Sequence, residues 1–236
     1  DSAVAALDRE AEEAEALGQF AQALELERRA LALIRETPHD PLIVDSSLGN
    51  LSNAYEVAGE WDELRAICEE RLALLPDIPT QRAERALVME TLGSAHLQLG
   101  HPAVAVEWLD KSIALYAQVA SGDPTNARIG RIVALVDQGR YQEALVACEP
   151  FLPELVAATQ PRPWRQGTIE WMLARTLWDE ADAHQRSRAV TLAADAERDF
   201  LAGIEILDKY PSAAASLAIV RTRLAELRAW RARHRI

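Results

Sequence analysis

The sequence predicts an all-α protein built from repeated helix pairs, and three observations indicate this class. Alanine and leucine, both strong helix formers, occur throughout a chain of 236 residues that is 49% hydrophobic. Alternating runs rich in Val, Ile and Thr, which are typical of strands, are nearly absent. Glycines recur at a nearly constant spacing with similar neighbours, which predicts a repeat architecture.

Four glycines mark the period. They are 41, 41 and 39 residues apart, at Gly18, Gly59, Gly100 and Gly139. An internal glycine costs a helix about 1 kcal/mol relative to alanine. We therefore expect each of them to end one helix and to form the turn into the next. The packing position five residues further on is small or apolar in every copy, at Ala23, Leu64, Ala105 and Ala144.

The period divides the chain into helix pairs, which we expect to form one domain over residues 1–236. Clusters of breakers and capping residues, "TPHDP", "PDIPT" and "SGDPT", separate the copies. Pro150 and Pro153 fall inside the second helix of the fourth copy, so we expect that helix to kink or restart. The predicted pairs cover residues 4–37, 45–78, 86–120 and 125–159, followed by a divergent pair over 162–209 with the turn "DEADAHQRS" and a capping helix over 212–233.

The second copy resembles the tetratricopeptide repeat (TPR) family, whose pattern is W-x2-L-G-x2-Y followed by a small residue, an aromatic residue and a proline. The matching residues are Leu48, Leu51, Ser52, Tyr55, Gly59, Trp61, Leu64 and Pro76. "Met89-x2-Leu92-Gly93-x2-His96" repeats the motif in the third copy, with His96 at a packing position. The resemblance implies a right-handed α-solenoid whose first helices line a concave groove. It also implies a non-catalytic module that binds a protein or peptide segment there.

Groove residues are expected on the face opposite the Leu48/Leu51/Tyr55 stripe, since residues three and four apart share a helix face. The Asn53 amide can donate to and accept from a peptide backbone, although a merely solvated role is the alternative. Asp8 and Glu12 stand where some family members carry a clamp for a carboxylate, so we expect a basic or neutral partner. The predicted groove residues are Asn53, Glu56, Glu90, Ser94, Gln98, Val133, Asp137, Trp171 and Arg175.

Trp171 and Arg175 belong to a second cluster with Trp164 and Trp178. Tryptophan and arginine are enriched at interface hot spots. Trp171 and Trp178 are seven residues apart on one helix face, however, so core packing and partner binding both stay open for them. Arg175 could stack on the aromatic rings or bridge to Asp179.

Composition excludes several function classes. A net charge of -12 disfavours nucleic-acid binding, and the basic C-terminal stretch "RTRLAELRAWRARHRI" has arginines all round a helix, as a solvated helix does. Cys68 and Cys148 occupy equivalent positions and are expected to be buried thiols. No metal-binding, catalytic or phosphate-binding string occurs, so we expect no cofactor. No membrane span or secretory signal is visible, so we expect the fragment to be cytoplasmic.

Three other functions stay open. The strings "LARTLWD", "AVTLAADAERDF" and "LAELRAWRARH" loosely resemble TPR regions appended to bacterial serine/threonine kinases. That resemblance, and a chain beginning at Asp1, fit a regulatory or sensor module from a larger signalling protein. A small-molecule sensor or enzyme could use a pocket inside the superhelix. Self-association through an apolar face is the third alternative.

Overall fold

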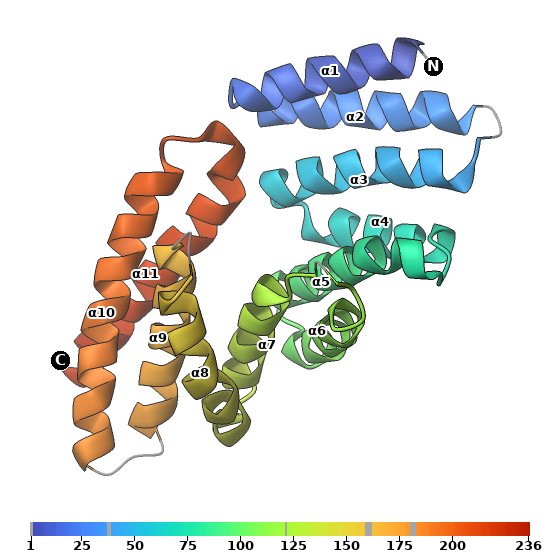
Figure 1. Ribbon diagram of the computed structural model, residues 1–236. Coiled ribbons are helices and arrows are strands. Elements are labelled where there is room, and N and C mark those ends of the chain that lie inside the picture. The colour runs from blue at the N-terminus through green and yellow to red at the C-terminus, as the bar shows by residue number, and fades with distance from the viewer. Residues whose placement is uncertain (1, 37–38, 121, 159–161, 180–182) are drawn as a thin grey trace. The chain divides into compact units, whose positions relative to one another are not determined.

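The computed structural model describes residues 2–36, 39–120, 122–158, 162–179 and 183–236. These residues form α-helices and two short 3₁₀ helices and contain no strand, which confirms the all-α repeat class (Figure 1). The 3₁₀ helices are η1 (Pro79–Gln81) and η2 (Pro211–Ala213). The α-helices are α1 (Ser2–Ala16), α2 (Phe20–Arg35), α3 (Pro41–Ala58), α4 (Trp61–Leu74), α5 (Arg82–Gln98), α6 (Pro102–Tyr116), α7 (Thr125–Asp137), α8 (Tyr141–Val156), α9 (Pro163–Asp179), α10 (Ala183–Leu207) and α11 (Ala214–His234).

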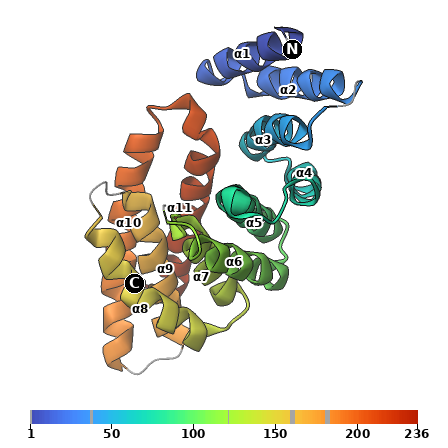
Figure 2. The same cartoon turned by 45° about the vertical axis from the view of Figure 1, so that its right-hand side comes forward.

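The contacts divide the chain into two compact units, residues 1–127 and 128–236. In the first unit each of the helices α1 to α6 packs against the next one along the chain, and α1 lies beside α2 in both views (Figures 1 and 2). In the second unit α9 packs against α8, α10 and α11. The expectation of one continuous domain stays a prediction.

The four period-marking glycines form the same turn, as the sequence predicts. Their φ angles lie between 71° and 76°, in the left-handed region that side chains with a Cβ avoid. At Gly59 the glycine N–H donates to the Glu56 carbonyl over 3.2 Å, and the Glu60 N–H donates to the Tyr55 carbonyl over 3.0 Å. The same two bonds recur at Gly18, Gly100 and Gly139. This Schellman geometry satisfies carbonyls that the helix end would otherwise leave free.

Packing follows the same register. The position five residues after each turn glycine is buried in every copy, at Ala23, Leu64, Ala105 and Ala144. Leu48, Leu51 and Tyr55 form part of a cluster that joins α2, α3, α4 and α5. The predicted stripe of α3 therefore faces the core of the first unit.

Helix boundaries agree with the predicted breaker and capping residues where the structure describes them. The Asp40 carboxylate accepts a hydrogen bond from the Leu42 N–H over 2.8 Å, and Pro41 occupies the first turn of α3. Pro79 opens η1 ahead of α5. Residues 37–38, 121 and 180–182 of the predicted breaker and turn segments lie outside the described residues. Helix α10 begins at Ala183, so residues 183–187 of the predicted turn are helical.

The predicted restart of the fourth copy's second helix is wrong, because α8 runs unbroken through Pro150 and Pro153. Each proline lacks the N–H that would reach the carbonyl four residues back. Those carbonyls belong to Val146 and Glu149, whose residues are both exposed. Water can satisfy them, so the helix tolerates both prolines.

Candidate binding surfaces

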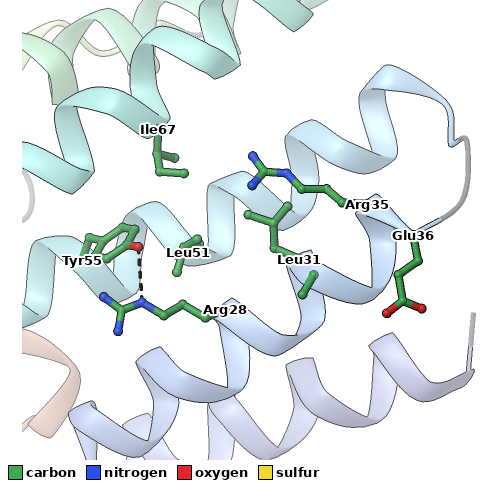
Figure 3. Close-up of a pocket in the computed structure, with 8 residues that line it drawn as sticks. Arg28, Leu31, Arg35, Glu36, Leu51, Tyr55 and Ile67 are labelled. Carbon is green, nitrogen blue, oxygen red and sulfur yellow. Dashed lines mark hydrogen bonds between the residues drawn. The ribbon is translucent and has the colours of Figure 1, made fainter.

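A groove of about 540 Å³ lies within the first unit, where α2, α3 and α4 meet (Figure 3). All three helices contribute side chains, and α2 contributes most of them. The lining residues are Arg28, Leu31, Ala32, Arg35, Glu36, Leu51, Tyr55 and Ile67.

The floor of the α2–α3–α4 groove is apolar and already ordered. Leu31, Leu51 and Tyr55 are buried members of the core cluster, and Ile67 packs against that cluster. Because these side chains are fixed by the packing beneath them, a ligand would meet a preformed surface.

The rim of the groove is charged. Arg28 Nε donates to the Tyr55 hydroxyl over 3.3 Å, and the Arg28 guanidinium carbon lies 5.3 Å from the centre of the Tyr55 ring (Figure 3). Arg35 Nη2 lies 2.7 Å from both carboxylate oxygens of Glu70 on α4. The groove therefore offers an apolar floor with oriented polar groups at its edge.

The predicted groove residues of the first unit differ in how much surface they present. Asn53 on α3 and Gln98 on α5 are exposed, and Ser94 on α5 is half-buried. Burial raises the pKa of the half-buried Glu56 carboxyl. Glu90 is buried within α5, so its side chain has little surface to offer a ligand.

In the second unit the structure brings predicted residues of α7 and α9 together. Arg175 Nη1 donates to Asp137 Oδ1 over 3.1 Å, and its guanidinium carbon lies 5.7 Å from the centre of the Trp171 ring. The side chain of Asp179, the other partner considered for Arg175, lies outside the described part of the chain. Val133 and Trp171 are only 3% and 2% exposed, so they act as packing residues.

A cluster of aromatic rings in the second unit shows how Trp171 and Trp178 pack. The Trp230 ring on α11 meets Trp171 edge to face at 5.0 Å and Trp178 at 5.4 Å between centroids. His234 lies 4.8 Å from Trp178 and 5.0 Å from Trp230. These aromatic side chains fix α11 on α9. Trp171 belongs to the core.

The cysteines are buried and free, as predicted. Burial raises the pKa of the Cys68 and Cys148 thiols to about 12, so neither is a thiolate nucleophile at neutral pH. His96 is half-buried, and burial lowers its pKa. Among the helices that the structure describes, none combines the length and the apolar composition that crossing a membrane requires.

Sequence reasoning missed the contribution of α2 to the groove. Arg28, Leu31 and Arg35 are three and four residues apart, so the sequence does place them on one helix face. That face becomes a binding surface only because α4 lies across from it. No local pattern reports that arrangement.

The helix pair α3–α4 carries the family signal. It combines the buried Leu48/Leu51/Tyr55 stripe, the left-handed Gly59 and the buried Leu64 in one unit. Residues 47–82 match the tetratricopeptide repeat. The predicted resemblance to TPR proteins is thereby confirmed for this pair. No curated protein matches the chain in sequence.

Solved structures place most of the chain among TPR-like folds. A Podosopora anserina putative kinesin light chain with nearly identical TPR-like repeats has a TM-score of 0.64 at 20% identity, covering 83% of this chain and 94% of that one. YrrB, described as a TPR protein with an unusual peptide-binding site, has a TM-score of 0.55 at 16% identity, covering 82% and 84%. Rap protein complexed with competence and sporulation factor has a TM-score of 0.59 at 15% identity, covering 94% and 64%.

Proposed function

We propose that this chain is a non-catalytic protein-interaction module that binds a peptide segment of a partner protein. The observation that carries the proposal is the α2–α3–α4 groove, with its ordered apolar floor and its charged rim. The similar folds of YrrB, described with a peptide-binding site, and of Rap, solved in complex with competence and sporulation factor, support it. The free buried cysteines favour a cytoplasmic setting.

Affinity would come from an apolar side chain of the partner seated over Leu31, Leu51 and Ile67. Complete burial of one such side chain is worth roughly 1.5–3 kcal/mol. The Tyr55 hydroxyl, held by Arg28, would supply a polar contact beside it. A preformed floor lowers the ordering cost, since few rotamers remain to be fixed on binding.

The exposed members of the predicted groove residues, which we call the concave row, are a second contact surface within the same proposal. In the first unit they are Asn53 and Gln98, and Ser94 is half-buried. Residues 1–127 hold 9 Lys and Arg against 23 Asp and Glu. Such a surface favours a basic or neutral partner over an acidic one.

A selection from a random twelve-residue peptide library on the purified chain tests the proposal. The affinity of the strongest peptide is then measured for Ala32→Trp, which fills the groove, and for Ala21→Trp, at another exposed position of α2 that lies outside the lining. We expect Ala32→Trp to weaken binding at least about tenfold, or 1.4 kcal/mol, and Ala21→Trp to change it less than about twofold.

The possible outcomes separate the two surfaces. Loss of binding in Asn53→Ala but not in Ala32→Trp would move the site from the α2–α3–α4 groove to the concave row. Failure of every library peptide to bind the folded chain would contradict the interaction function itself.

A further inference from the structure

One buried position of the repeat carries a charged residue in a single copy. Nine residues after each turn glycine lies a buried side chain, and in three copies it is apolar or a thiol, at Cys68, Leu109 and Cys148. In the first copy the same position is Glu27, which is only 4% exposed. A carboxylate therefore occupies a core position where its counterparts have no charge.

Glu27 faces the contact between α1 and α2. Its neighbours one turn away on α2, Ala23 and Ala30, belong to the cluster that packs against Ala11 and Ala14 of α1. The Glu27 Oε2 atom is buried and has no hydrogen-bond partner among the residues that the structure describes. A buried polar group without a partner destabilises the fold, and more so when it is charged.

Three further carboxylates, all on α1, lie close enough to Glu27 for their charges to act on it. Asp8, Glu12 and Glu15 are four and three residues apart, so they share one helix face. Glu12 is exposed, and Asp8 and Glu15 are half-buried. Within the described ranges, Asp8 Oδ1 is buried and has no hydrogen-bond partner. Burial, and then the negative charges of Asp8, Glu15 and Glu12, raise the pKa of Glu27 to about 8.

One member of the Asp8/Glu12/Glu15/Glu27 cluster feels a positive charge, because burial and the charge of Glu12 raise the pKa of Asp8 and the N-terminal amino group partly offsets that rise. No ion pair joins any of the four carboxylates to a lysine or arginine in the part of the chain that the structure describes. A divalent metal ion does not fit either, since no three His, Cys, Asp or Glu side chains among the described residues converge closely enough to hold one. A single cationic side chain is therefore the counter-charge that fits Glu27.

We propose that a lysine or arginine side chain of the partner polypeptide inserts at the α1–α2 contact and pairs with Glu27 and Asp8. This inference rests on the proposed peptide-binding function and names the chemistry of one side chain of the ligand. The exposed Glu12 attracts the cation, and the buried oxygens of Asp8 and Glu27 receive its N–H donors. Charge-assisted hydrogen bonds of this kind are about twice as strong as neutral ones.

The test compares two substitutions of equal charge on the same helix. Glu27→Gln removes the buried carboxylate, and Glu25→Gln removes an exposed one. The probe is the strongest library peptide and its version with every lysine and arginine replaced by glutamine. We expect selection on the wild type to enrich lysine or arginine at a fixed position. We expect Glu27→Gln to weaken that peptide at least about tenfold, and Glu25→Gln less than about twofold.

Proton release gives a second readout. Because Glu27 is largely protonated near neutral pH, pairing it with a cation must expel its proton. Calorimetry in buffers of different ionisation enthalpy should show that release for the wild type and for Glu25→Gln but not for Glu27→Gln. Circular dichroism shows whether Glu27→Gln still folds. The same measurement is made on Glu27→Leu, which carries the leucine found at the equivalent position of the third copy.

Several outcomes would overturn the site. Equal losses in Glu27→Gln and Glu25→Gln would indicate attraction by net charge alone. If the selected peptides show no enriched lysine or arginine, the cation site is contradicted and the peptide-binding function is not. If no peptide binds at all, both proposals are contradicted. If spermidine displaces the peptide and binds with an affinity equal to the peptide's, the cluster is a site for a free polyamine instead.

Discussion

Arg71 Nε donates to Asp45 Oδ1 over 2.9 Å, and both side chains are more than nine-tenths buried. The same guanidinium also bonds to Glu84 on α5, so Arg71 links α3, α4 and α5. Removing one partner of a buried pair leaves an uncompensated charge in the core. The buried pair therefore joins the two helices of the second pair, and the bond to Glu84 connects them to the first helix of the third pair.

We expect Arg71→Met to lower the free energy of unfolding by about 3 kcal/mol, because Asp45 would stay buried without its cation. Urea unfolding followed by circular dichroism measures the change. Arg65→Met on the same helix is the control, since Arg65 pairs with Asp62 and Glu69 at the surface. It should cost less than about 1 kcal/mol, and equal costs for the two variants would argue against a structural role for the buried pair.

Two glycine-to-alanine substitutions should differ in cost for a stated steric reason. A Cβ at Gly93 would lie 2.6 Å from Leu109 Cγ, so α5 and α6 would have to separate. A Cβ at Gly100 would meet nothing within 4 Å, and only its φ of 76° opposes the change. We expect about 2–3 kcal/mol for Gly93→Ala and about 1–2 kcal/mol for Gly100→Ala. The reverse order in thermal or urea unfolding would contradict the close approach of the two helices.

Stability should fall as pH rises, because of Glu27. The folded-state pKa is about 8, whereas the ordinary value is 4.5, so between these values the folded chain holds a proton that the unfolded chain has lost. The penalty is absent below pH 4.5, grows up to about pH 8 and then stays constant. The groups responsible besides burial are Asp8, Glu12 and Glu15 on α1.

Glu27→Leu should remove this part of the pH dependence and stabilise the chain at pH 8 by a few kcal/mol. Denaturant unfolding at pH 5, 6.5 and 8 measures the slope, and Glu25→Gln should retain the slope of the wild type. A Glu27→Leu variant that is less stable than the wild type at pH 8 would refute the assignment of Glu27 as an unpaired buried acid.

Trp230 should be a core residue of the second unit and not a contact for a partner. Its ring packs edge to face on Trp171 and Trp178, so Trp230→Ala should cost about 3–5 kcal/mol. Tyr210→Ala, at an exposed position of the same unit, should cost less than about 0.5 kcal/mol. Tryptophan fluorescence during unfolding reports on this cluster. Similar costs for both variants would contradict the packing.

The parts of the fold that depend on local signals could be predicted from the sequence. Gly59 ends a helix because the left-handed turn excludes other residues, and this requirement appears at the same spacing in each copy. The restart predicted at Pro150 was wrong because the effect of a proline depends on whether water reaches the carbonyl of Val146. The sequence does not show that this carbonyl lies on the exposed face of α8. The rule was wrong about a restart of the helix, and the alternative of a kink stays a prediction.

The candidate sites depended on information that the sequence does not carry. Tyr55 was predicted to pack inward, and it does, but its hydroxyl also reaches Arg28 at the groove. Pairing α2 with α4 across that groove requires the three-dimensional stack. Glu27, by contrast, left a readable signal: the ninth position after Gly18 carries a charge where Cys68, Leu109 and Cys148 carry none.

The two buried thiols have a practical consequence for spectroscopy. With pKa values near 12 and no solvent contact, Cys68 and Cys148 should be inert to maleimides at neutral pH. A single cysteine introduced at Ala32 or Ala21 can therefore be labelled on the otherwise native chain. A solvent-sensitive dye at these two positions would report occupancy of the groove directly, with both natural cysteines left in the core that they help to fill.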